Sequence, residues 1–384
     1  MKTAKVEKPT SAPKKTRISA MFDHEVAVYI GRFEPFHVGH LALLRQALAV
    51  GRKVVVVLGS SFQARTTKNP LKWRERARMI SLSVSKEERK RLHFLPVRDY
   101  YDSDGEGDRK WVAAIRAGVA SVAGETASVA LVGHHKDASS YYLENFPGWQ
   151  QVECDRVGDI DATSLRKVIF KMGHKNPEAA LSLLGDYMPQ GACDFLEGWM
   201  ELPCYEALVQ EWKMQKEAKK KWKTAPYAPT FVTVDALIIC AGHVLLVRRE
   251  RAPGKGLLAV PGGFLDQVET LYQGAVREMR EECRPQVDDE TLRAAYKGAF
   301  VYGHPGRSLR GRTVTHLHVF ELPGELPELL GSEDPNEATS EWIAIKNLAD
   351  MEEEFFEDHF HMLDSRLKLT TNRKLPVATS ALDL

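Results

Sequence analysis

Hydrophobic and polar positions follow two alternating periods over the first part of the chain. Short apolar runs typical of buried strands occupy residues 26–30, 53–58, 93–97 and 128–132. Between them, residues 41–50, 72–84 and 111–123 place apolar side chains at helical spacing. A strand that is apolar on both faces is typical of a parallel sheet covered by helices on both sides. The pattern therefore predicts an α/β fold with a doubly wound, Rossmann-like parallel sheet, whose ligands would lie beyond the carboxyl ends of the strands.

The pattern changes after residue 178. Residues 179–223 are mostly helical in spacing and end in the charged run KMQKEAKKKWK, which indicates a solvated helix face or, as the lesser alternative, a phosphate or nucleic-acid contact. Two prolines, Pro226 and Pro229, mark a boundary. Strand-like runs follow at 231–239, 243–248, 313–320 and 341–345, around one strong helical segment at 270–283. We therefore predict a second domain of mixed α and β structure.

Composition and charge exclude several classes of protein. The 384 residues have a formal net charge of +1, so bulk charge does not indicate a nucleic-acid or membrane-surface protein. No apolar run approaches the ~20 residues that a membrane helix needs. The five cysteines are scattered without CxxC spacing, which indicates buried thiols in a reducing compartment, and we expect a cytoplasmic protein. Residues 1–21 are basic and polar, and we expect them to form a disordered tail.

The loop after the first predicted strand carries the first candidate site. Its sequence, GRFEPFHVGH, runs from Gly31 to His40, and helical spacing follows at once. A strand, a tight loop and a helix N-terminus together make a phosphate site. His37 and His40 are three residues apart and share one face of the helix, where two imidazoles could stabilise charge on a reacting phosphorus. Gly39 between them would let a phosphate approach the backbone. A histidine pair that only caps the helix is the alternative.

This stretch resembles the HxGH-containing nucleotidyltransferase superfamily, and more closely its nicotinamide mononucleotide adenylyltransferase branch. Members transfer AMP from ATP to a nucleotide phosphate and release pyrophosphate. The resemblance implies that His37 and His40 bind the ATP phosphates with help from Arg32. The acceptor phosphate would attack in line, so catalysis would come from positioning and charge neutralisation by the histidines, Arg166, Mg²⁺ and helix dipoles.

Further segments lie where this resemblance places them. The run NPLKWRER begins at Asn69, and Asp99 followed by Trp111 is similar to the segment in which a tryptophan stacks on the pyridine ring, with core packing as the alternative for Trp111. The run DATSLR, residues 161–166, is similar to the Ser/Thr-x-x-Arg signature, in which Thr163 would cap the helix and Arg166 would point to the phosphates; a solvent-exposed Arg166 is the alternative. We expect His37, His40 and Arg166 to be catalytic and the substrate-binding residues to be Gly31, Arg32, Phe33, Gly39, Asn69, Asp99, Trp111, Gly133 and Thr163.

The helix predicted at 270–283 carries the second candidate site. Glu278 and Glu282 are four residues apart, and Glu281 is three from Glu278, so all three carboxylates lie near one stripe. Like charges at this spacing repel, and a divalent cation with oxygen ligands would relieve the repulsion. Glu269 lies two helical turns before Arg277 and could orient it. A solvated acidic face is the alternative.

The complete spacing from Gly263 onward resembles the Nudix box, Gly-x5-Glu-x7-Arg-Glu-apolar-x-Glu-Glu-x-Gly-apolar. The resemblance implies an α/β/α Nudix sandwich that hydrolyses nucleoside diphosphates linked to another group. It also implies metal ligands at Glu278, Glu281 and Glu282 for Mg²⁺ or Mn²⁺, with Glu282 as the candidate base, and supporting roles for Gly263, Glu269 and Arg277. The final Gly-apolar pair of the box is Arg284-Pro285 here, which puts the shape of the following loop, and hence the rate, in doubt.

The segments around the box extend the resemblance to bifunctional adenylyltransferase/Nudix proteins. These segments are YAPTFVTVD, RRERAPGKGL, RGRTVT and FEDH. Arg307, Arg310 and Arg312 could meet substrate phosphates, and we expect Arg310 and Arg312 to bind substrate; arginines on a surface loop are the alternative. In that family the Nudix substrate is typically ADP-ribose, which is cut to AMP and ribose 5-phosphate.

Together the two motif sets predict a tail at 1–21, a nucleotidyltransferase domain at 22–178, a helical connector at 179–225, a Nudix domain at 226–370 and a C-terminal tail at 371–384. We expect ATP, nicotinamide mononucleotide, NAD and ADP-ribose as ligands, no nucleic acid and no membrane, and the question of a homo-oligomer stays open. The alternatives are an adenylyltransferase with another acceptor, or a Nudix half that senses a ligand or hydrolyses another nucleoside diphosphate. The intact carboxylates and the absence of an obvious DNA-reading motif disfavour the sensor.

Overall fold

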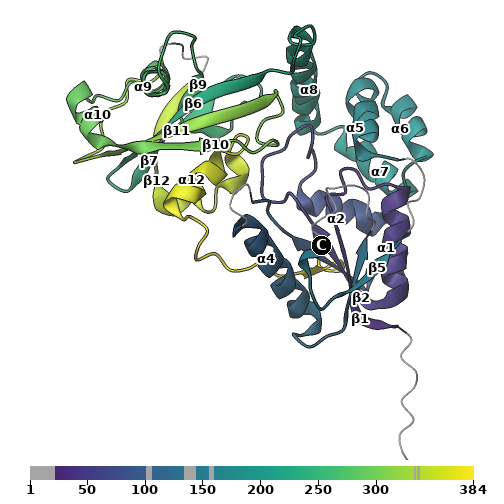
Figure 1. Cartoon of the computed structure of the whole chain (residues 1–384). Coiled ribbons are helices and arrows are strands. Elements are labelled where there is room, and N and C mark those ends of the chain that lie inside the picture. Colours follow the sequence, from purple (N-terminus) through teal and green to yellow (C-terminus); the bar gives the residue numbers. More distant parts are fainter. Residues whose placement is uncertain (1–21, 101–105, 134–143, 155–159, 333, 335–337) are drawn as a thin grey trace, which may run out of the picture.

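The computed structural model describes the chain except for residues 1–21, 101–105, 134–143, 155–159, 333 and 335–337. The tail predicted at 1–21 lies outside the described residues. Two sheets organise the rest, one in each half of the chain, and the long helix α8 (Pro203–Lys221) stands between them (Figure 1). Within the described ranges, no helix combines the length and the apolar character needed to cross a membrane.

The first sheet has the strand order β13-β3-β2-β1-β4-β5. All neighbours in it pair in parallel except the edge strand β13, which is antiparallel to β3. The four valines at 54–57 are completely buried, as expected for a strand covered on both faces. The predicted doubly wound parallel sheet is confirmed. Its strands are β1 (His24–Gly31), β2 (Gly51–Leu58), β3 (Leu92–Pro96), β4 (Val129–Gly133), β5 (Gln150–Glu153) and β13 (Thr379–Ser380).

Helices cover both faces of this sheet. One face packs against α1, α2 and the helices from α5 to α8, and the other packs against α4. Trp199 and Leu208, from the segment predicted as a connector, belong to the same core as Val54 and Val56 of β2. The connector is therefore also a layer of the first domain. The helices are α1 (Val38–Val50), α2 (Trp73–Leu82), α3 (Lys86–Arg89), α4 (Glu106–Ala123), α5 (Ala162–Val168), a π-helical turn (Ile169–Gly173), α6 (Pro177–Gly185) and α7 (Gln190–Trp199).

The second sheet has the strand order β10-β11-β6-β7-β12, with β8 paired to β7 and β9 paired to β6. Helix α9 packs on one face through Ala275 and Met279, and α12 packs on the other through Phe360 and Leu363. Two covered faces make the predicted α/β/α sandwich. Its elements are β6 (Thr230–Cys240), β7 (His243–Arg249), β8 (Leu258–Ala259), β9 (Gly262–Phe264), α9 (Leu271–Glu282), α10 (Asp289–Ala295), β10 (Tyr296–Tyr302), β11 (Arg312–Leu322), β12 (Ala338–Ala344), α11 (Ile345–Leu348), a 3-10 turn (Glu352–Glu354) and α12 (His359–Leu367).

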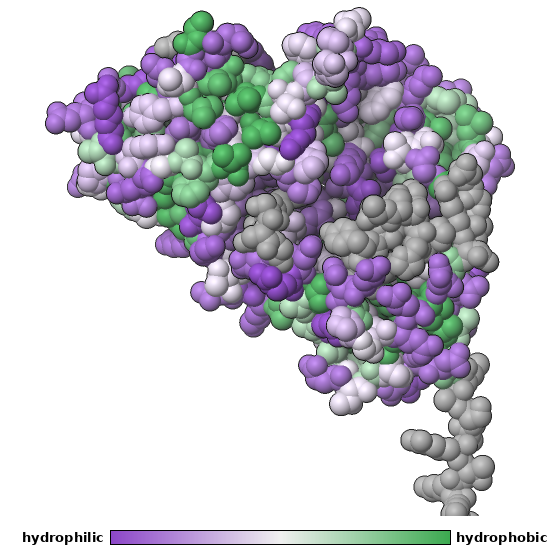
Figure 2. Space-filling view, viewed as in Figure 1, coloured by the Kyte–Doolittle hydropathy of each residue, from purple (hydrophilic) through white to green (hydrophobic). Residues whose placement is uncertain are grey.

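Polar contacts and the end of the chain join the two domains. An ion pair links Arg98 to Glu352 at 2.6 Å, and another links Lys72 to Glu353 at 2.6 Å. Mainly hydrophilic residues lie where the two lobes meet in the view of Figure 2.

The segment 371–384, predicted as a tail, returns to the first sheet, where it supplies β13 and the buried Ala381 (Figure 1). A two-residue strand carries no periodicity, so the sequence could not indicate it. The domain boundaries themselves stay predictions.

Candidate active sites

The first site lies where β1 ends and α1 begins. His37 is the N-cap of α1, and the capping is reciprocal: His37 Nδ1 accepts from the backbone N–H of His40 at 3.4 Å, and His40 Nδ1 accepts from the backbone N–H of His37 at 3.3 Å. The two rings stack with centroids 3.6 Å apart. Because each Nδ1 accepts a hydrogen bond, each neutral ring carries its proton on Nε2. The helix-cap alternative therefore accounts for the Nδ1 atoms only. It also fixes the proton of each neutral ring on Nε2, so that Nε2–H is a hydrogen-bond donor.

The charge state of His40 follows from its surroundings. Burial, and then the neighbouring His37, holds the pKa of His40 well below its ordinary value. The ring is therefore neutral near pH 7 and acts as a hydrogen-bond donor rather than as a cation. The positive N-terminal end of α1 supplies the complementary field for an anion.

Phe33 was expected to bind substrate, but its side chain lies in the core. The residue is 1 % exposed, and its ring centroid lies 5.1 Å from the rings of both Tyr29 and His40. A Cβ at Gly31 would come 2.8 Å from this ring, so the loop closes tightly over it. The side chain of Phe33 supports His40 and shapes the loop, so a contact with substrate would come from its backbone and stays a prediction.

Arg166 lies on α5 and joins the same loop. Its Nη1 donates to the backbone oxygen of Glu34 at 2.6 Å, and its Nη2 donates to Thr163 Oγ1 at 3.2 Å. With 8 % of its surface exposed, Arg166 is not the solvent-exposed alternative. Burial, and then the nearby Arg32, lowers the pKa of Arg166, so two guanidinium groups share a partly desolvated region that an anion would stabilise.

The cap of α5 is Asp161 and not Thr163. Asp161 has an extended backbone, and its Oδ1 accepts from the backbone N–H of Ser164 at 3.0 Å. The expectation that Thr163 caps this helix is wrong because the helix begins at Ala162, two residues earlier than a Thr163 cap would allow. Thr163 instead fixes the guanidinium of Arg166.

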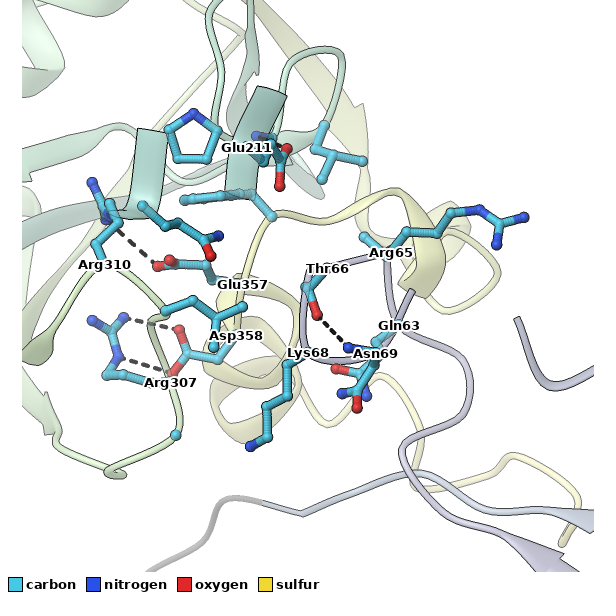
Figure 3. A pocket seen from close by; sticks show the side chains of 18 of the residues that line it. Gln63, Arg65, Thr66, Lys68, Asn69, Glu211, Arg307, Arg310, Glu357 and Asp358 are labelled. Carbon is cyan, nitrogen blue, oxygen red and sulfur yellow. Dashed lines mark hydrogen bonds and ion pairs between the residues drawn. The ribbon is translucent and has the colours of Figure 1, made fainter. Parts of the chain in front are cut away.

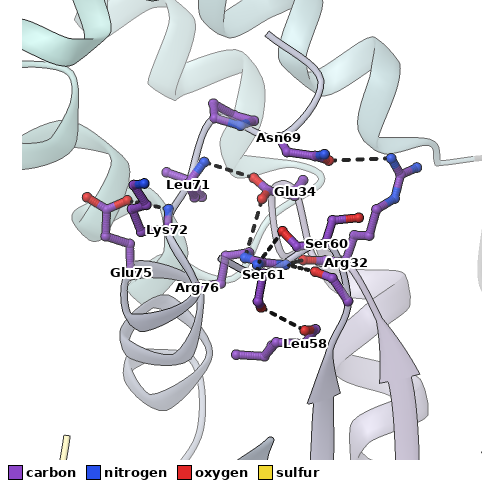
Figure 4. A network of polar contacts seen from close by, with 12 residues as sticks. Arg32, Glu34, Leu58, Ser60, Ser61, Asn69, Leu71, Lys72, Glu75 and Arg76 are labelled. Atoms are coloured by element: carbon purple, nitrogen blue, oxygen red, sulfur yellow. Dashed lines mark hydrogen bonds and ion pairs between the residues drawn. The ribbon is translucent and has the colours of Figure 1, made fainter. Parts of the chain in front are cut away.

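A buried arginine, Arg76, connects the two loops at the carboxyl edge of the sheet (Figure 4). Its Nη1 donates to the backbone oxygens of Arg32 and Gly59, both at 2.7 Å, and its Nη2 donates to Ser61 Oγ at 3.1 Å. Its Nε lies 3.3 Å from Glu34, whose pKa burial raises to about 7 against the opposing effect of Arg76. Sequence reasoning missed both charges as site residues, because Arg76 is one of several arginines in α2.

Asp99 and Asn69 hold neighbouring parts of the same edge. Asp99 accepts from the backbone N–H of Ser60 at 3.1 Å and from its hydroxyl at 2.5 Å, and Asn69 Oδ1 accepts from Arg32 Nη1 at 3.4 Å. Both residues therefore order the phosphate-side loops in the structure. Any contact with substrate stays a prediction.

The remaining predicted residues of the first site lie nearby in the fold. Trp111 is half-buried on α4, with its ring 5.9 Å from that of Phe146, which fits the core-packing alternative in part. Gly39 is buried in the first turn of α1, and Gly133 ends β4 at the carboxyl edge. The stacking role of Trp111 is untested.

The second site lies on α9, where one arginine collects the acidic side chains. Arg277 makes a bidentate pair with Glu269, at 2.7 and 2.9 Å, so the expected contact is present. Its Nη1 also lies 2.9 Å from Glu278 and 3.0 Å from Glu281. The hydrogen bond from Arg277 is the main cause that lowers the pKa of Glu269 to about 2. Arg277 thus holds the stripe of carboxylates together.

Glu282 is a half-buried member of the stripe. It accepts from the backbone N–H of Gly262 at 3.0 Å, and burial, with a further contribution from Glu278, raises its pKa to about 8. A Cβ at Gly263 would come 2.4 Å from Glu278 Oε1, and one at Gly262 would come 2.3 Å from Asp235 Oδ1. Only glycine fits between these carboxylates.

Asp235, on β6, is a buried acid near the carboxylate stripe, and sequence reasoning missed it as a site residue. Burial raises its pKa to about 7, while Arg307 lowers it, and its carboxylate accepts from the Thr315 hydroxyl. A charged residue inside the apolar run FVTVDALII was the available signal, because a strand covered on both faces does not normally carry an unpartnered acid.

The donor set fits a hard divalent cation, although it is not yet arranged around one. Among the described residues, no group of three or more His, Cys, Asp or Glu side chains surrounds a common point as metal ligands. The reason is visible in the contacts, since Arg277 draws Glu278 and Glu281 to itself. Burial also raises the pKa of Glu278, so Glu278 and Glu282 are adjacent carboxylates whose repulsion a cation would relieve. Glu278, Glu281 and Glu282 are the residues that would hold it.

Arg284 takes the position of the missing glycine and adopts the backbone that a glycine would. Its φ is 46°, in the left-handed region. Its guanidinium donates to the backbone oxygens of Gly331 at 2.8 Å, Leu330 at 3.2 Å and Ser332 at 3.3 Å. These bonds offset the cost of the left-handed backbone, so the loop keeps its shape despite the departure from the box.

We expect both Arg284→Ala and Arg284→Gly to lower the midpoint of thermal unfolding. The free energy of unfolding of Arg284→Gly should be about 1 kcal/mol higher than that of Arg284→Ala. Both variants lose the three hydrogen bonds, but only glycine relieves the left-handed backbone. Calorimetric unfolding of the full chain measures the difference. Equal destabilisation by both variants would show that the backbone at Arg284 is unstrained.

The three candidate arginines of the Nudix domain have different surroundings. Arg307 is 5 % exposed and makes a bidentate pair with Asp358, at 2.9 and 3.0 Å, so its Nε and Nη2 hold the fold together. Arg310 lies 3.5 Å from Glu357 and faces a cavity. Arg312 is exposed, and its Nη1 donates to the backbone oxygen of Thr313 at 3.4 Å. A role in substrate binding is a prediction for Arg310 and Arg312.

Comparison with known proteins matches both sites. A cytidylyltransferase-like family model matches residues 28–103, and a NUDIX domain model matches residues 229–365. The chain is 33 % identical over 196 residues to the nicotinamide/nicotinic acid mononucleotide adenylyltransferase of Acinetobacter baylyi, covering 51 % of this chain and 97 % of that protein. It is 31 % identical over 135 residues to the ADP-ribose pyrophosphatase of Methanocaldococcus jannaschii, covering 35 % of this chain and 73 % of that protein.

One solved structure spans both halves. The crystal structure of a bifunctional NMN adenylyltransferase/ADP ribose pyrophosphatase from Francisella tularensis, in complex with AMP and a manganese ion, is 33 % identical and superposes with a TM-score of 0.80. The match covers 90 % of this chain and 99 % of that one, so the two domains have the same order and a similar placement. On these matches and the two sites above, the chain belongs to the family of bifunctional nicotinamide mononucleotide adenylyltransferase/Nudix ADP-ribose pyrophosphatases.

Proposed function

We propose that this chain transfers AMP from ATP to nicotinamide mononucleotide, giving NAD and pyrophosphate, and hydrolyses ADP-ribose to AMP and ribose 5-phosphate. The observation that carries the proposal is the single structural match to a bifunctional enzyme, which spans both sites at once. Neither another acceptor nucleotide nor a sensor role for the Nudix half has a comparable observation in its favour.

In the first reaction, an oxygen of the acceptor 5′-phosphate attacks the α-phosphorus of ATP, and the bond to the β-phosphate oxygen breaks. The acceptor is already anionic, so no general base is needed. We assign the Nε2–H groups of His37 and His40, with Arg166, to the negative charge that grows on the phosphates. Arg76 keeps the two loops at fixed separation and is a positioning residue. Mg²⁺ bound to ATP would neutralise further charge.

In the second reaction, water attacks a phosphorus of the diphosphate and the bond to the bridging oxygen breaks. Glu278, Glu281 and Glu282 would hold a divalent cation, Mg²⁺ or Mn²⁺, which when bound neutralises the diphosphate and lowers the pKa of water. Glu282 is our candidate for the base. Without a cation, burial raises its pKa to about 8, and a bound cation would favour the ionised carboxylate, which is the form that can take up a proton. Arg277 orients the ligands, and Arg310 would contact the diphosphate substrate.

Product analysis of the full chain tests both activities. With ATP, nicotinamide mononucleotide and Mg²⁺ we expect NAD and pyrophosphate, and with ADP-ribose and Mg²⁺ or Mn²⁺ we expect AMP and ribose 5-phosphate. EDTA should abolish the hydrolysis and excess Mn²⁺ should restore it. An absence of NAD would contradict the acceptor assignment, and intact ADP-ribose would contradict the Nudix assignment, independently of each other.

A further inference from the structure

An open cavity lies between the two domains and is lined from both (Figure 3). The loop 63–69 and Asp99 of the adenylyltransferase domain form one side. The loop 306–310 and residues 356–358 of the Nudix domain form the other, and helix α8 adds Glu211 and Gln215. A hydrogen bond of 2.7 Å from Thr67 to Gln215 fixes the first loop against α8.

The Nudix wall of this cavity is continuous with the carboxylate site. The guanidinium of Arg310 lies 5.7 Å from the ring centroid of Phe356 and 5.3 Å from that of Phe264, the residue that follows Gly263 in β9. The guanidinium of Arg249 lies 4.3 Å from the centroid of the same ring, and the charge of Glu282 raises the pKa of Arg249 against the larger effect of burial. A substrate with its diphosphate at the carboxylates would therefore extend past Arg310 and Phe356 into the cavity.

The cations of the cavity are not equivalent. Arg307 is paired with Asp358, Arg310 with Glu357, and Arg65 with Glu75. In the described part of the chain, Lys68 makes no ion pair, and its exposed side chain projects into the space between the domains (Figure 3). Its Nζ lies 3.9 Å from the position of a Cβ on Gly306, so it reaches across to the Nudix loop.

The surroundings of Lys68 favour an anionic or oxygen-rich ligand. Partial burial, and then Arg32, lowers its pKa, which means that its charge is imperfectly compensated. Asp99 raises the pKa of Lys68, but the two groups form no ion pair, because the Asp99 carboxylate accepts hydrogen bonds from the backbone N–H and the hydroxyl of Ser60. An ammonium group with this balance gains from phosphate or sugar oxygens in the cavity.

We infer that the adenylyltransferase domain completes the Nudix substrate pocket, with Lys68 binding the part of a nucleoside diphosphate sugar that extends away from the carboxylate site. The inference rests on the proposed ADP-ribose hydrolysis for its ligand. Lys68 is a specificity-determining residue in this arrangement, and it belongs to the domain that does not carry out the hydrolysis. The similar placement of the domains in the Francisella tularensis enzyme supports a fixed, rather than incidental, wall.

Three variants of the full chain test the assignment. Lys68→Met removes the charge at similar length, and Lys68→Arg keeps it. Lys72→Met is the matched control, because Lys72 also reaches the Nudix domain, through its 2.6 Å ion pair with Glu353, but does not line this cavity. For each we would measure KM and kcat for ADP-ribose with Mn²⁺, and the Kd of ADP-ribose by calorimetry in EDTA, where hydrolysis does not proceed.

We expect Lys68→Met to raise both KM and Kd about tenfold with kcat within about twofold, because a contact made equally in ground and transition states affects binding alone. Lys68→Arg should retain most of the affinity, and Lys72→Met should match the wild type. Unchanged Kd in Lys68→Met, or an equal loss in Lys72→Met, would overturn the inference. If the wild type binds ADP-ribose without hydrolysing it, the proposed function fails, and the Kd comparison still decides the role of Lys68.

Discussion

Replacing Glu282 by glutamine is expected to reduce ADP-ribose hydrolysis on the order of 10³-fold and to leave NAD synthesis unchanged. Glutamine keeps the shape of the side chain and can still accept the 3.0 Å hydrogen bond from Gly262, so the fold should persist. It removes one negative charge from the carboxylate stripe and cannot take up a proton. Release of AMP from ADP-ribose at saturating Mn²⁺ measures the effect, with NAD formation followed in the same preparation.

The matched control is Glu290→Gln, the same substitution on an exposed position of α10 in the same domain. It should leave both activities at the wild-type level. Full hydrolysis by Glu282→Gln would remove Glu282 from the catalytic site. Loss of both activities together would instead point to a global effect on folding, which the midpoint of thermal unfolding would reveal.

Replacing His40 by glutamine is expected to lower NAD synthesis on the order of 10²-fold with little change in stability. Glutamine at the third helical position can still accept from the backbone N–H of the N-cap residue, so the reciprocal cap of α1 survives. What is lost is the imidazole Nε2–H at the positive end of the helix. Initial rates with ATP and nicotinamide mononucleotide, together with thermal unfolding, separate the two roles.

A second variant addresses the other histidine of the pair. Asparagine is a strong N-cap residue, so His37→Asn should also preserve the helix while it removes the ring. His243→Gln, in the Nudix domain, is the matched control, because its ring Nδ1 donates locally, to the backbone oxygen of Ala241 at 2.9 Å. If both cap-preserving variants kept full NAD synthesis, the histidines would be helix caps alone. ADP-ribose hydrolysis should be unaffected in all three.

Much of the fold could be read from periodicity, and the exceptions have a local cause. The valine run in β2 and the apolar stripe of α9 predicted their elements because burial of one face, or of both, imposes a repeat on the sequence. Strand β10 was missed because Gly298, with φ at 123°, and a register shift beside it break the alternation. Strands β8 and β13, with two residues each, are too short to carry any repeat.

The candidate residues divide in a similar way. Spacing predicted which side chains of His37, His40 and the α9 carboxylates are neighbours, because each group lies within one or two turns of a single helix, and the family resemblance supplied their expected roles. The cap of α5 was misjudged and the burial of Phe33 was not foreseen, because they depend on where a helix begins and on what packs beneath a loop. Spacing in the sequence determines neither.

By itself, the sequence determined that this protein has α/β structure in both halves, an HxGH loop at the start of a helix and a stripe of carboxylates on another helix. Only the tertiary structure decided which charges are already used. It paired Arg307 with Asp358, placed Arg76 between two loops and set Lys68 opposite the Nudix domain. The physical reason is that a charge costs free energy when it loses water. Whether it regains that energy depends on partners that the fold brings close, here from residues up to 281 positions away.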